Sequence, residues 1–198
     1  MQLTHDPEGK LLGILGMGGI GSAFAKRAAP FGMRIQYHNR KPVSKERNVV
    51  GAEYVGFEEL IRTSDIISIH LPLNSSTRGM ISARELEMMK PGVVIINTAR
   101  GPIVDEAALV EALESGKVFA AGLDVYENEP IVHEGLLRND KCILMPHVGT
   151  ATLETQRKME ILVLDNLNLA VTEGRLTTPV AESQQAGLGL QKPNYDRL

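Results

Sequence analysis

The sequence predicts an α/β protein built on a doubly wound parallel β-sheet. Short aliphatic runs alternate with helical patterns from residue 11 to about residue 173, and a glycine cluster follows the first run. Most of these runs are almost continuously apolar, as expected for parallel strands that are covered on both faces. Alternating strands and helices specify a doubly wound sheet, whose ligands bind beyond the carboxyl ends of the strands. We therefore look for function in the loops that follow the strands.

Each predicted element has its own signal. The six strand candidates are 10–15, 34–38, 65–70, 93–97, 119–124 and 142–146. The first helix shows helical spacing and places on one face Ile20, Ala23, Phe24, Arg27, Ala28 and Phe31. Ser82 and Glu85 form a predicted capping box, and Asp105 and Gly116 mark the start and end of a later helix. The last predicted helix covers 151–173, with one face formed by Met159, Leu162, Val163, Leu167, Ala170 and Val171.

Composition and charge argue against several classes of protein. The 198 residues carry a net charge of −3 with 23% charged residues, so nothing indicates nucleic acid or a membrane surface as partner. No apolar run approaches the roughly 20 residues of a membrane span, and the N-terminal segment MQLTHDPEGK lacks the apolar core of a signal peptide. The single cysteine, Cys142, excludes an intrachain disulfide and fits a reducing compartment. We expect a cytoplasmic protein without a metal site, in which Cys142 is a small core residue.

The glycine cluster forms a G-x-G-x-x-G motif between the first strand and the first helix. Gly16, Gly18 and Gly21 occupy the glycine positions, and Gly19 and Ile20 lie between the last two. The first glycine permits a tight turn, the second lets the backbone approach a pyrophosphate, and the third allows helix and strand to pack closely. The diphosphate is expected at the helix N-terminus, where N–H groups and the helix dipole favour an anion. This context predicts a Rossmann-type fold with a single cofactor-binding domain.

The residue expected to contact the adenosine ribose is not an acid. A carboxylate normally binds the 2′-hydroxyl about 20 residues after the glycines, whereas Asn39, Arg40 and Lys41 stand there in this sequence. Without the repulsion of an acid, Arg40 can bind a 2′-phosphate through two hydrogen bonds, and Lys41 adds a second positive charge. We predict that NADP(H) is preferred over NAD(H); the alternative is a solvated turn with incidental charges. Tyr37 and Lys41 also match the Tyr-x-x-x-Lys of short-chain dehydrogenases, but that pair requires a helix, and Tyr37 ends a predicted strand.

Polar side chains follow three later strands. Arg100 follows the fourth predicted strand, Asp124 and Glu129 stand at the end of the fifth and beyond it, and His147 follows the last. Taken singly, these residues also fit a surface ion pair, a loop acid and a turn histidine. Because the carboxyl ends of parallel strands meet at one edge of a sheet, we expect them to lie on the same edge as the glycine loop. Together they predict an active site.

In this order, the motifs resemble the D-isomer-specific 2-hydroxyacid dehydrogenases, and most closely their glyoxylate/hydroxypyruvate reductase branch. The resemblance covers about residues 7–180 and rests on GILGMGGIG, HLPLNSSTRGMI, KPGVVIINTARGPIVDEAAL, AAGLDVYENEP and PHVGTAT. It implies an NAD(P)H-dependent oxidoreductase that reduces a small 2-oxo acid, such as glyoxylate or hydroxypyruvate, to the 2-hydroxy acid. It also implies that His147 is the acid/base, Glu129 its partner and Arg100 the substrate anchor. These types suit the reaction, because histidine titrates near neutrality, a carboxylate orients its ring, and arginine binds carboxylates.

The same resemblance implies further cofactor contacts. It places Asp124 at the carboxamide end of the nicotinamide and Thr77 in hydrogen-bonding reach of the cofactor. Of the other histidines, His70 is expected to be structural, and His5, His38 and His133 are expected at the surface. The predicted cofactor-binding residues are Gly16, Gly18, Gly19, Ile20, Gly21, Asn39, Arg40, Lys41, Leu71, Pro72, Thr77, Thr98, Ala99, Arg100, Asp124, His147 and Gly149.

The resemblance also bears on domain organisation. Family members have a substrate lobe before the dinucleotide-binding lobe, and we expect that lobe to be missing from this sequence. Residues 1–178 are predicted to form the dinucleotide-binding domain, and 179–198 a flexible tail that remains from the return to the substrate lobe. The resemblance implies a homodimer, although the sequence leaves the oligomeric state open. A non-catalytic NAD(P)-binding module with a sensor or assembly role is the alternative function, since the family's corepressor relatives keep the same Arg, Glu and His.

Overall fold

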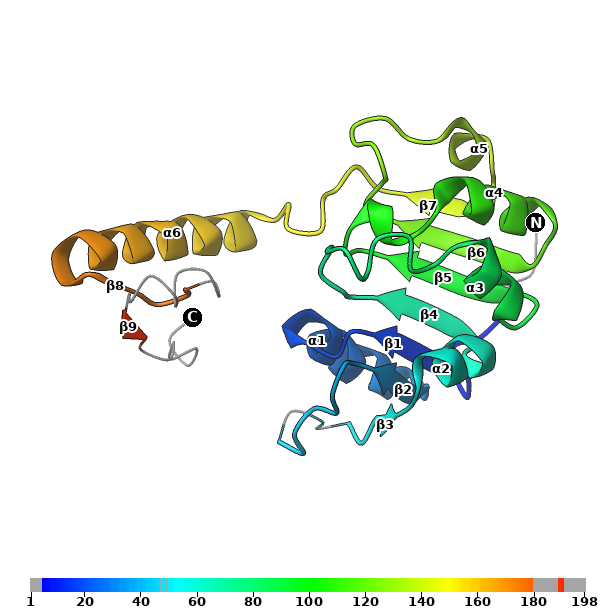
Figure 1. Ribbon diagram of the computed structural model, residues 1–198, viewed down its shortest axis with the longest axis horizontal. Coiled ribbons are helices and arrows are strands. Elements are labelled where there is room, and N and C mark those ends of the chain that lie inside the picture. The colour runs from blue at the N-terminus through cyan, green and yellow to red at the C-terminus, as the bar shows by residue number, and fades with distance from the viewer. Residues whose placement is uncertain (1–4, 47, 49, 180–188, 191–198) are drawn as a thin grey trace. The chain divides into compact units, whose positions relative to one another are not determined.

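A computed structural model of the chain describes residues 5–46, 48, 50–179 and 189–190. The chain divides into two compact units, Met1–His147 and Val148–Leu198. The first unit contains a seven-stranded sheet with the strand order β3-β2-β1-β4-β5-β6-β7 (Figure 1). Every neighbouring pair of strands in it is parallel. The strand order reverses between β1 and β4, which is where ligands bind in doubly wound sheets.

The first unit follows the predicted alternation of strands and helices. Its strands are β1 (Leu11–Leu15), β2 (Arg34–His38), β3 (Glu53–Tyr54), β4 (Ile66–Ile69), β5 (Val93–Asn97), β6 (Val118–Leu123) and β7 (Cys142–Leu144). Its helices are α1 (Gly19–Ala28), η1 (Ala29–Phe31), α2 (Phe57–Thr63), α3 (Ala83–Met88), η2 (Gly101–Ile103), α4 (Glu106–Glu114) and α5 (Glu134–Leu137). All six predicted strands are present, and the fold class is confirmed. The elements β3, α2 and α5 are absent from the prediction because they are too short to show a clear periodicity.

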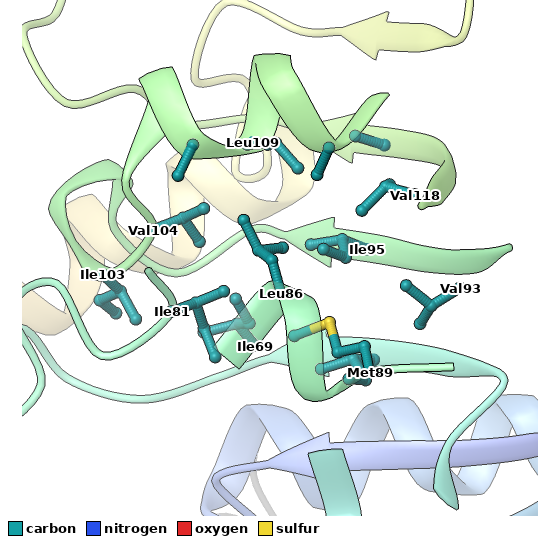
Figure 2. Packing of buried hydrophobic residues seen from close by; sticks show 14 of the residues in the cluster. Ile69, Ile81, Leu86, Met89, Val93, Ile95, Ile103, Val104, Leu109 and Val118 are labelled. Carbon is teal, nitrogen blue, oxygen red and sulfur yellow. The ribbon is translucent and has the colours of Figure 1, made fainter. Parts of the chain in front are cut away.

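Two apolar clusters cover the two faces of this sheet. On β1, Leu12 and Ile14 belong to the cluster beneath α1, whereas Leu15 belongs to the larger cluster beneath α2, α3 and α4 (Figure 1). Successive side chains of a strand point to opposite faces, so β1 contributes to both clusters. Figure 2 shows the larger cluster, where Leu86 and Leu109 pack over the strand residues. Cys142 is half-buried against this cluster, and burial, helped by Asp140, raises the pKa of its thiol.

Two of the predicted helix starts are confirmed by their hydrogen bonds. At α3, the Glu85 carboxylate accepts the Ser82 N–H at 3.1 Å and the Ser82 hydroxyl at 2.5 Å. At α4, Asp105 Oδ1 accepts the Ala108 N–H at 3.0 Å. Such caps satisfy backbone donors that have no partner inside the helix.

The predicted apolar face of the first helix is only partly confirmed, since Ala28 is buried and Phe24 packs against the cluster beneath α1. Ile20 and Phe31 are 71% and 64% exposed, and the residues of α1 that are buried are Gly21, Ala25 and Ala28. These small residues repeat at i, i+4 and i+7, and they let the helix axis approach the sheet closely. Hydrophobic periodicity alone favours large side chains, so it included the exposed Ile20 and Phe31 and missed the small buried residues Gly21 and Ala25.

Coverage on both faces is confirmed for only part of the sheet. Four of the five residues of β1 and three of the four residues of β4 are buried. Along β5, however, Val94 and Ile96 are half-buried and alternate with buried residues, and Ile143 of β7 is 71% exposed. Within the first unit, the helices after β4 all lie over the larger cluster, so the other face of β5–β7 receives less cover.

The second unit is described by itself. It contains α6 (Leu153–Glu173), which confirms the predicted last helix, and a parallel pair formed by β8 (Arg175–Leu176) and β9 (Gly189–Leu190). Thr152 caps α6 by accepting the Thr155 N–H at 3.2 Å, and Gly174 ends it with φ 64. No helix in the part of the chain that the structure describes is long and apolar enough to cross a membrane. The predicted domain boundary after residue 178 and the predicted flexible tail stay predictions, since 180–188 and 191–198 lie outside the described residues.

Candidate active site

The glycine loop after β1 is fixed by contacts that leave no room for side chains. Gly16 has φ 101, and a Cβ at this position would lie 2.7 Å from the His70 carbonyl oxygen. A Cβ on Gly21 would lie 2.1 Å from the Gly16 carbonyl oxygen. By contrast, a Cβ on Gly18 or Gly19 would meet nothing within 4 Å. The backbone there is accessible at the N-terminus of a ten-residue helix, which is a favourable place for a phosphate.

The side chain of Asn39 braces this loop. Its Oδ1 accepts the Met17 N–H at 2.7 Å. The backbone carbonyl oxygen of Asn39 accepts the Tyr54 hydroxyl at 3.1 Å. The Met17 N–H occupies one of the two lone pairs of the side-chain oxygen, and the NH₂ group can donate to phosphate oxygens. The next two side chains, Arg40 and Lys41, are exposed.

A cavity of about 690 Å³ lies between the glycine loop and the ends of β2 and β4. Its predicted cofactor residues come from three separate segments of the chain. The cavity is lined by Gly16, Gly18, His38, Asn39, Arg40, Lys41, His70, Leu71, Pro72, Asn74, Ser76, Thr77 and Met80. The predicted residues Gly19, Ile20 and Gly21 belong to α1 and do not line it. A smaller cavity of about 360 Å³, at the opposite edge of the sheet, contains the Lys90–Asp65 ion pair and none of the predicted catalytic or cofactor-binding residues.

Thr77 organises the turn after β4. Its hydroxyl donates to the Pro72 carbonyl oxygen at 2.7 Å and accepts the Asn74 N–H at 2.9 Å. The residue is only 6% exposed. Thr77 thus holds Pro72 and Asn74 in the cavity wall, and its predicted hydrogen bond to the cofactor stays a prediction.

Two histidines belong to the cavity wall. His70 Nε2 lies 2.9 Å from Ser68 Oγ, while its Nδ1 is buried with no partner among the described residues. Burial lowers the pKa of His70 from 6.5 to about 4, so its ring is neutral at physiological pH. His38 is half-buried, and its Nδ1 lies 2.9 Å from the Val55 carbonyl oxygen. The expectation that His38 is a surface residue is therefore wrong, because β3 and the segment after it cover this end of β2.

At the other strand ends, Glu129 and His147 form a hydrogen-bonded pair. His147 Nδ1 donates to Glu129 Oε2 at 2.7 Å, and the Tyr126 N–H donates to the other carboxylate oxygen at 3.0 Å. The side chains of His147 and Glu129 are 49% and 35% exposed, so a small molecule can reach both. The bond from His147, the Tyr126 N–H and the positive charge of Arg100 hold the pKa of Glu129 below its ordinary value. An ionised Glu129 fixes the ring of His147 with Nε2 available for proton transfer.

Arg100 lies after β5 and is exposed. Its Nη1 donates to the Ala99 carbonyl oxygen at 2.6 Å, and its charge acts on Glu129. Thr98 is exposed and Ala99 half-buried, whereas Asp124 is buried and its N–H donates to the Asn97 carbonyl oxygen at 3.0 Å. The cofactor contacts of these residues stay predictions. So does the contact of Gly149, which belongs to the second unit.

The loops that carry these groups are tied together behind them. The Tyr126 hydroxyl donates to the Met145 carbonyl oxygen at 2.8 Å, which joins the loop of Glu129 to the segment of His147. Gly101 packs so closely against the same loop that a Cβ would lie 1.9 Å from the Tyr126 carbonyl carbon. The segment of Arg100 is thereby joined to the other two.

Fold and site together define a class of protein. A parallel sheet with a glycine loop and a cavity at its switch point defines a dinucleotide-binding domain, and a histidine held by a carboxylate is an arrangement that can transfer a proton. Residues 1–149 match the sequence model of the D-isomer specific 2-hydroxyacid dehydrogenase family, NAD binding domain. The chain therefore belongs to this family, as the motifs of the sequence indicate.

Individual relatives agree with this assignment. The chain is 57% identical over 182 residues to 4-methyl-2-oxopentanoate reductase A of Aspergillus oryzae. The matched region covers 92% of this chain and 55% of that protein. A glyoxylate reductase structure from Paecilomyes thermophila superposes with a TM-score of 0.89 at 58% identity, covering 92% of this chain and 55% of that one. The structure of an NADPH-dependent glyoxylate/hydroxypyruvate reductase of Sinorhizobium meliloti, in complex with NADP and malonate, superposes with a TM-score of 0.83 at 40% identity. The match covers 88% of this chain and 54% of that one. The chain spans about half the length of these relatives.

Several residues of the site were not identified from the sequence. Asn74, Ser76 and Met80 line the cavity, and all three lie within the HLPLNSSTRGMI motif, which could have drawn attention to them. The tying role of Tyr126 had no such signal, because it depends on the approach of two loops 19 residues apart in sequence.

Proposed function

We propose that the chain is the cofactor-binding part of an NADP(H)-dependent reductase that converts a small 2-oxo acid to the 2-hydroxy acid. The observation that carries the proposal is the Glu129–His147 pair at 2.7 Å. It lies at the carboxyl edge of the sheet that also carries the glycine loop and its cavity. Reduction of a carbonyl requires both a hydride donor and a proton donor, and this edge offers a place for each.

The residues around the cavity fit a dinucleotide. Gly18 and Gly19 leave space beside an exposed backbone at the start of α1, which suits the diphosphate. Leu71 and Pro72 supply an apolar wall. When bound, NADPH supplies the hydride. Thr98 and Asp124 would hold its nicotinamide end, so that hydride transfer would occur beside His147.

The acid/base residues then have separate tasks. His147, held through Nδ1 by Glu129, donates a proton from Nε2 to the oxygen that gains negative charge during reduction. Arg100 binds the substrate carboxylate and polarises the carbonyl. In the reverse direction the same ring accepts the proton of the hydroxyl.

The preference for the 2′-phosphate rests on charge and on hydrogen-bond type. Asn39 is neutral and carries an NH₂ donor, and Arg40 and Lys41 line the same cavity. The Sinorhizobium meliloti relative with 40% identity is described as NADPH-dependent, which supports the proposal. The substrate class is supported by relatives named for glyoxylate, hydroxypyruvate and 4-methyl-2-oxopentanoate. The expected homodimer and the cytoplasmic location stay predictions; sedimentation equilibrium checks the first.

A titration of the chain with NADPH and NADH, followed by fluorescence or calorimetry, tests the proposal. NADPH should bind about tenfold more tightly or better. Arg40→Ala and Lys41→Ala should each remove much of that difference, while Lys45→Ala, which removes the same charge outside the cavity, should not. Equal binding of the two cofactors would refute the preference, and no binding of either would refute the function. Because the chain spans about half the length of its relatives, little oxidation of NADPH by glyoxylate or hydroxypyruvate is expected from the chain alone. Any such oxidation should be abolished by His147→Gln and not by His5→Gln.

A further inference from the structure

Glu106, a buried acid at the start of α4, has no part in the proposed reaction. It is 7% exposed, and the Glu127 N–H donates to its Oε1 at 2.7 Å. In return, the Glu106 N–H donates to Glu127 Oε1 at 3.0 Å. Burial, together with the nearby charge of Glu127, raises the pKa of Glu106.

These contacts are not required to cap α4. Asp105 already does this by accepting the Ala108 N–H, and a first-turn acid such as Glu106 ordinarily points into water. Keeping its carboxylate buried has a cost that only well-placed donors offset. Because the Glu127 N–H comes from another loop, the arrangement serves the loop at least as much as the helix.

That loop carries Glu129. Glu106 accepts the Glu127 N–H, and Glu127 Oε1 accepts the Glu106 N–H, two residues before Glu129 in the loop. The Tyr126 N–H, one residue before this anchor, is the group that holds Glu129 Oε1 at 3.0 Å. Gly101 blocks movement of Tyr126 and Glu127 from the other side. Glu129 Oε2 is thereby held 2.7 Å from His147 Nδ1.

We infer that Glu106 is a positioning residue for the acid/base pair, because its carboxylate fixes Glu127 in the loop that presents Glu129 to His147. The inference deepens the proposed function and rests on it for its catalytic meaning. The geometry itself can be tested without substrate or cofactor. The inference can therefore be refuted while the proposed function stands, and the proposed function can be refuted while the inference stands.

The ring tautomer of His147, read from ¹⁵N chemical shifts of the labelled full chain at alkaline pH, reports on this geometry. His147→Gln identifies the signals. In the parent chain, Glu129 should keep the proton on Nδ1. Glu106→Ala and Glu106→Asp remove the acceptor or its reach, so the Nε2–H form that free imidazole favours should become the major one. Glu106→Gln retains an oxygen for the Glu127 N–H and should lie closer to the parent chain than Glu106→Asp.

Glu85 provides the matched control. It is an equally buried acid at a helix start, 5% exposed, and it accepts donors from Ser82 instead of from the loop of Glu129. Glu85→Ala should lower the thermal midpoint without changing the His147 tautomer. If Glu106→Ala does not fold, Glu106→Asp decides the matter, since it keeps the charge. An unchanged tautomer in Glu106→Asp, or an equal change in Glu85→Ala, would overturn the inference.

Discussion

Two regions of the first unit carry the candidate site, and they are held by different kinds of contact. The cofactor side comprises the glycine loop, residues 39–41 and residues 70–80, around the cavity. Its geometry comes from backbone approach, as between Gly21 and the Gly16 carbonyl oxygen. The acid/base side comprises residues 98–101, 124–133 and 145–147. There, exposed reactive side chains are held by carboxylates that accept backbone N–H groups, as Glu129 and Glu106 do.

The two sides are therefore sensitive to different kinds of substitution. A region shaped by backbone approach cannot accept added volume, because packed backbone has no rotamer to change. A region shaped by hydrogen-bonded carboxylates is sensitive instead to loss of an acceptor, which leaves a partly buried donor unpaired. Substitutions that add a methyl group and substitutions that remove an oxygen should therefore separate the two sides.

Added volume should have the largest effect. Gly21→Ala should destabilise the chain by about 3 kcal/mol and abolish NADPH binding, because its Cβ would lie 2.1 Å from the Gly16 carbonyl oxygen. Gly18→Ala is the control: its φ of −77 suits alanine and its Cβ meets nothing within 4 Å. It should change stability by less than about 0.5 kcal/mol while still weakening the cofactor. Urea unfolding and an NADPH titration measure both effects, and equal destabilisation would contradict the backbone account.

Acid should affect the two sides over different pH ranges. Burial lowers the pKa of His70 to about 4 from 6.5, so between these values the unfolded chain binds more protons than the folded one. Stability should fall as pH decreases from 6.5 to 4, by about 2 kcal/mol. For Glu129, whose pKa is lowered, the contribution is complete above its ordinary pKa and is lost as pH falls through the lowered value. Urea midpoints of the parent chain and of His70→Asn, recorded from pH 7 to 4, check this prediction. If the midpoints of both proteins changed equally with pH, His70 would not titrate as expected.

Removal of an acceptor on the cofactor side should have an intermediate effect. Asn39→Ala leaves the Met17 N–H without its 2.7 Å partner and should destabilise the loop by about 1.5 kcal/mol. Since the loop serves both cofactors, NADPH and NADH should both bind more weakly. Asn39→Asp keeps an acceptor for Met17 but adds a negative charge, so it should weaken NADPH alone. If Asn39→Ala weakened only NADPH, the side chain would act as a phosphate contact and not as a brace.

The two sides also differ in how far the sequence predicts them. Continuous aliphatic runs predict the strands, and the spacing of Gly16, Gly18 and Gly21 predicts the tight packing of the glycine loop, because both signals are local. The brace from Asn39 to Met17 and the bonds between Glu106 and Glu127 join residues 22 and 21 positions apart. No periodicity encodes such contacts, since they exist only after the strands have paired. The burial of His70 and the exposure of Ile20 were inaccessible for the same reason.

Two tyrosines, one on each side, allow a matched comparison in which the expected loss of stability is smallest. The Tyr126 hydroxyl donates to the Met145 carbonyl oxygen at 2.8 Å on the acid/base side. The Tyr37 hydroxyl accepts the Val43 N–H at 3.0 Å on the cofactor side and so closes the segment that holds Arg40 and Lys41. Replacing either by Phe removes one hydroxyl and should cost about 1 kcal/mol.

The functional consequences of these two changes should be opposite. Tyr126→Phe should alter the His147 ring signals and leave NADPH affinity unchanged, because Met145 lies two residues before His147. Tyr37→Phe should weaken NADPH more than NADH and leave those signals unchanged. Thermal unfolding, an NADPH and NADH titration, and ¹⁵N spectra of the histidines measure the three effects. If both variants changed both the NADPH affinity and the His147 signals, the cofactor and acid/base sides would form one cooperative unit. The different contacts that hold the two sides would then have no separate effect on function.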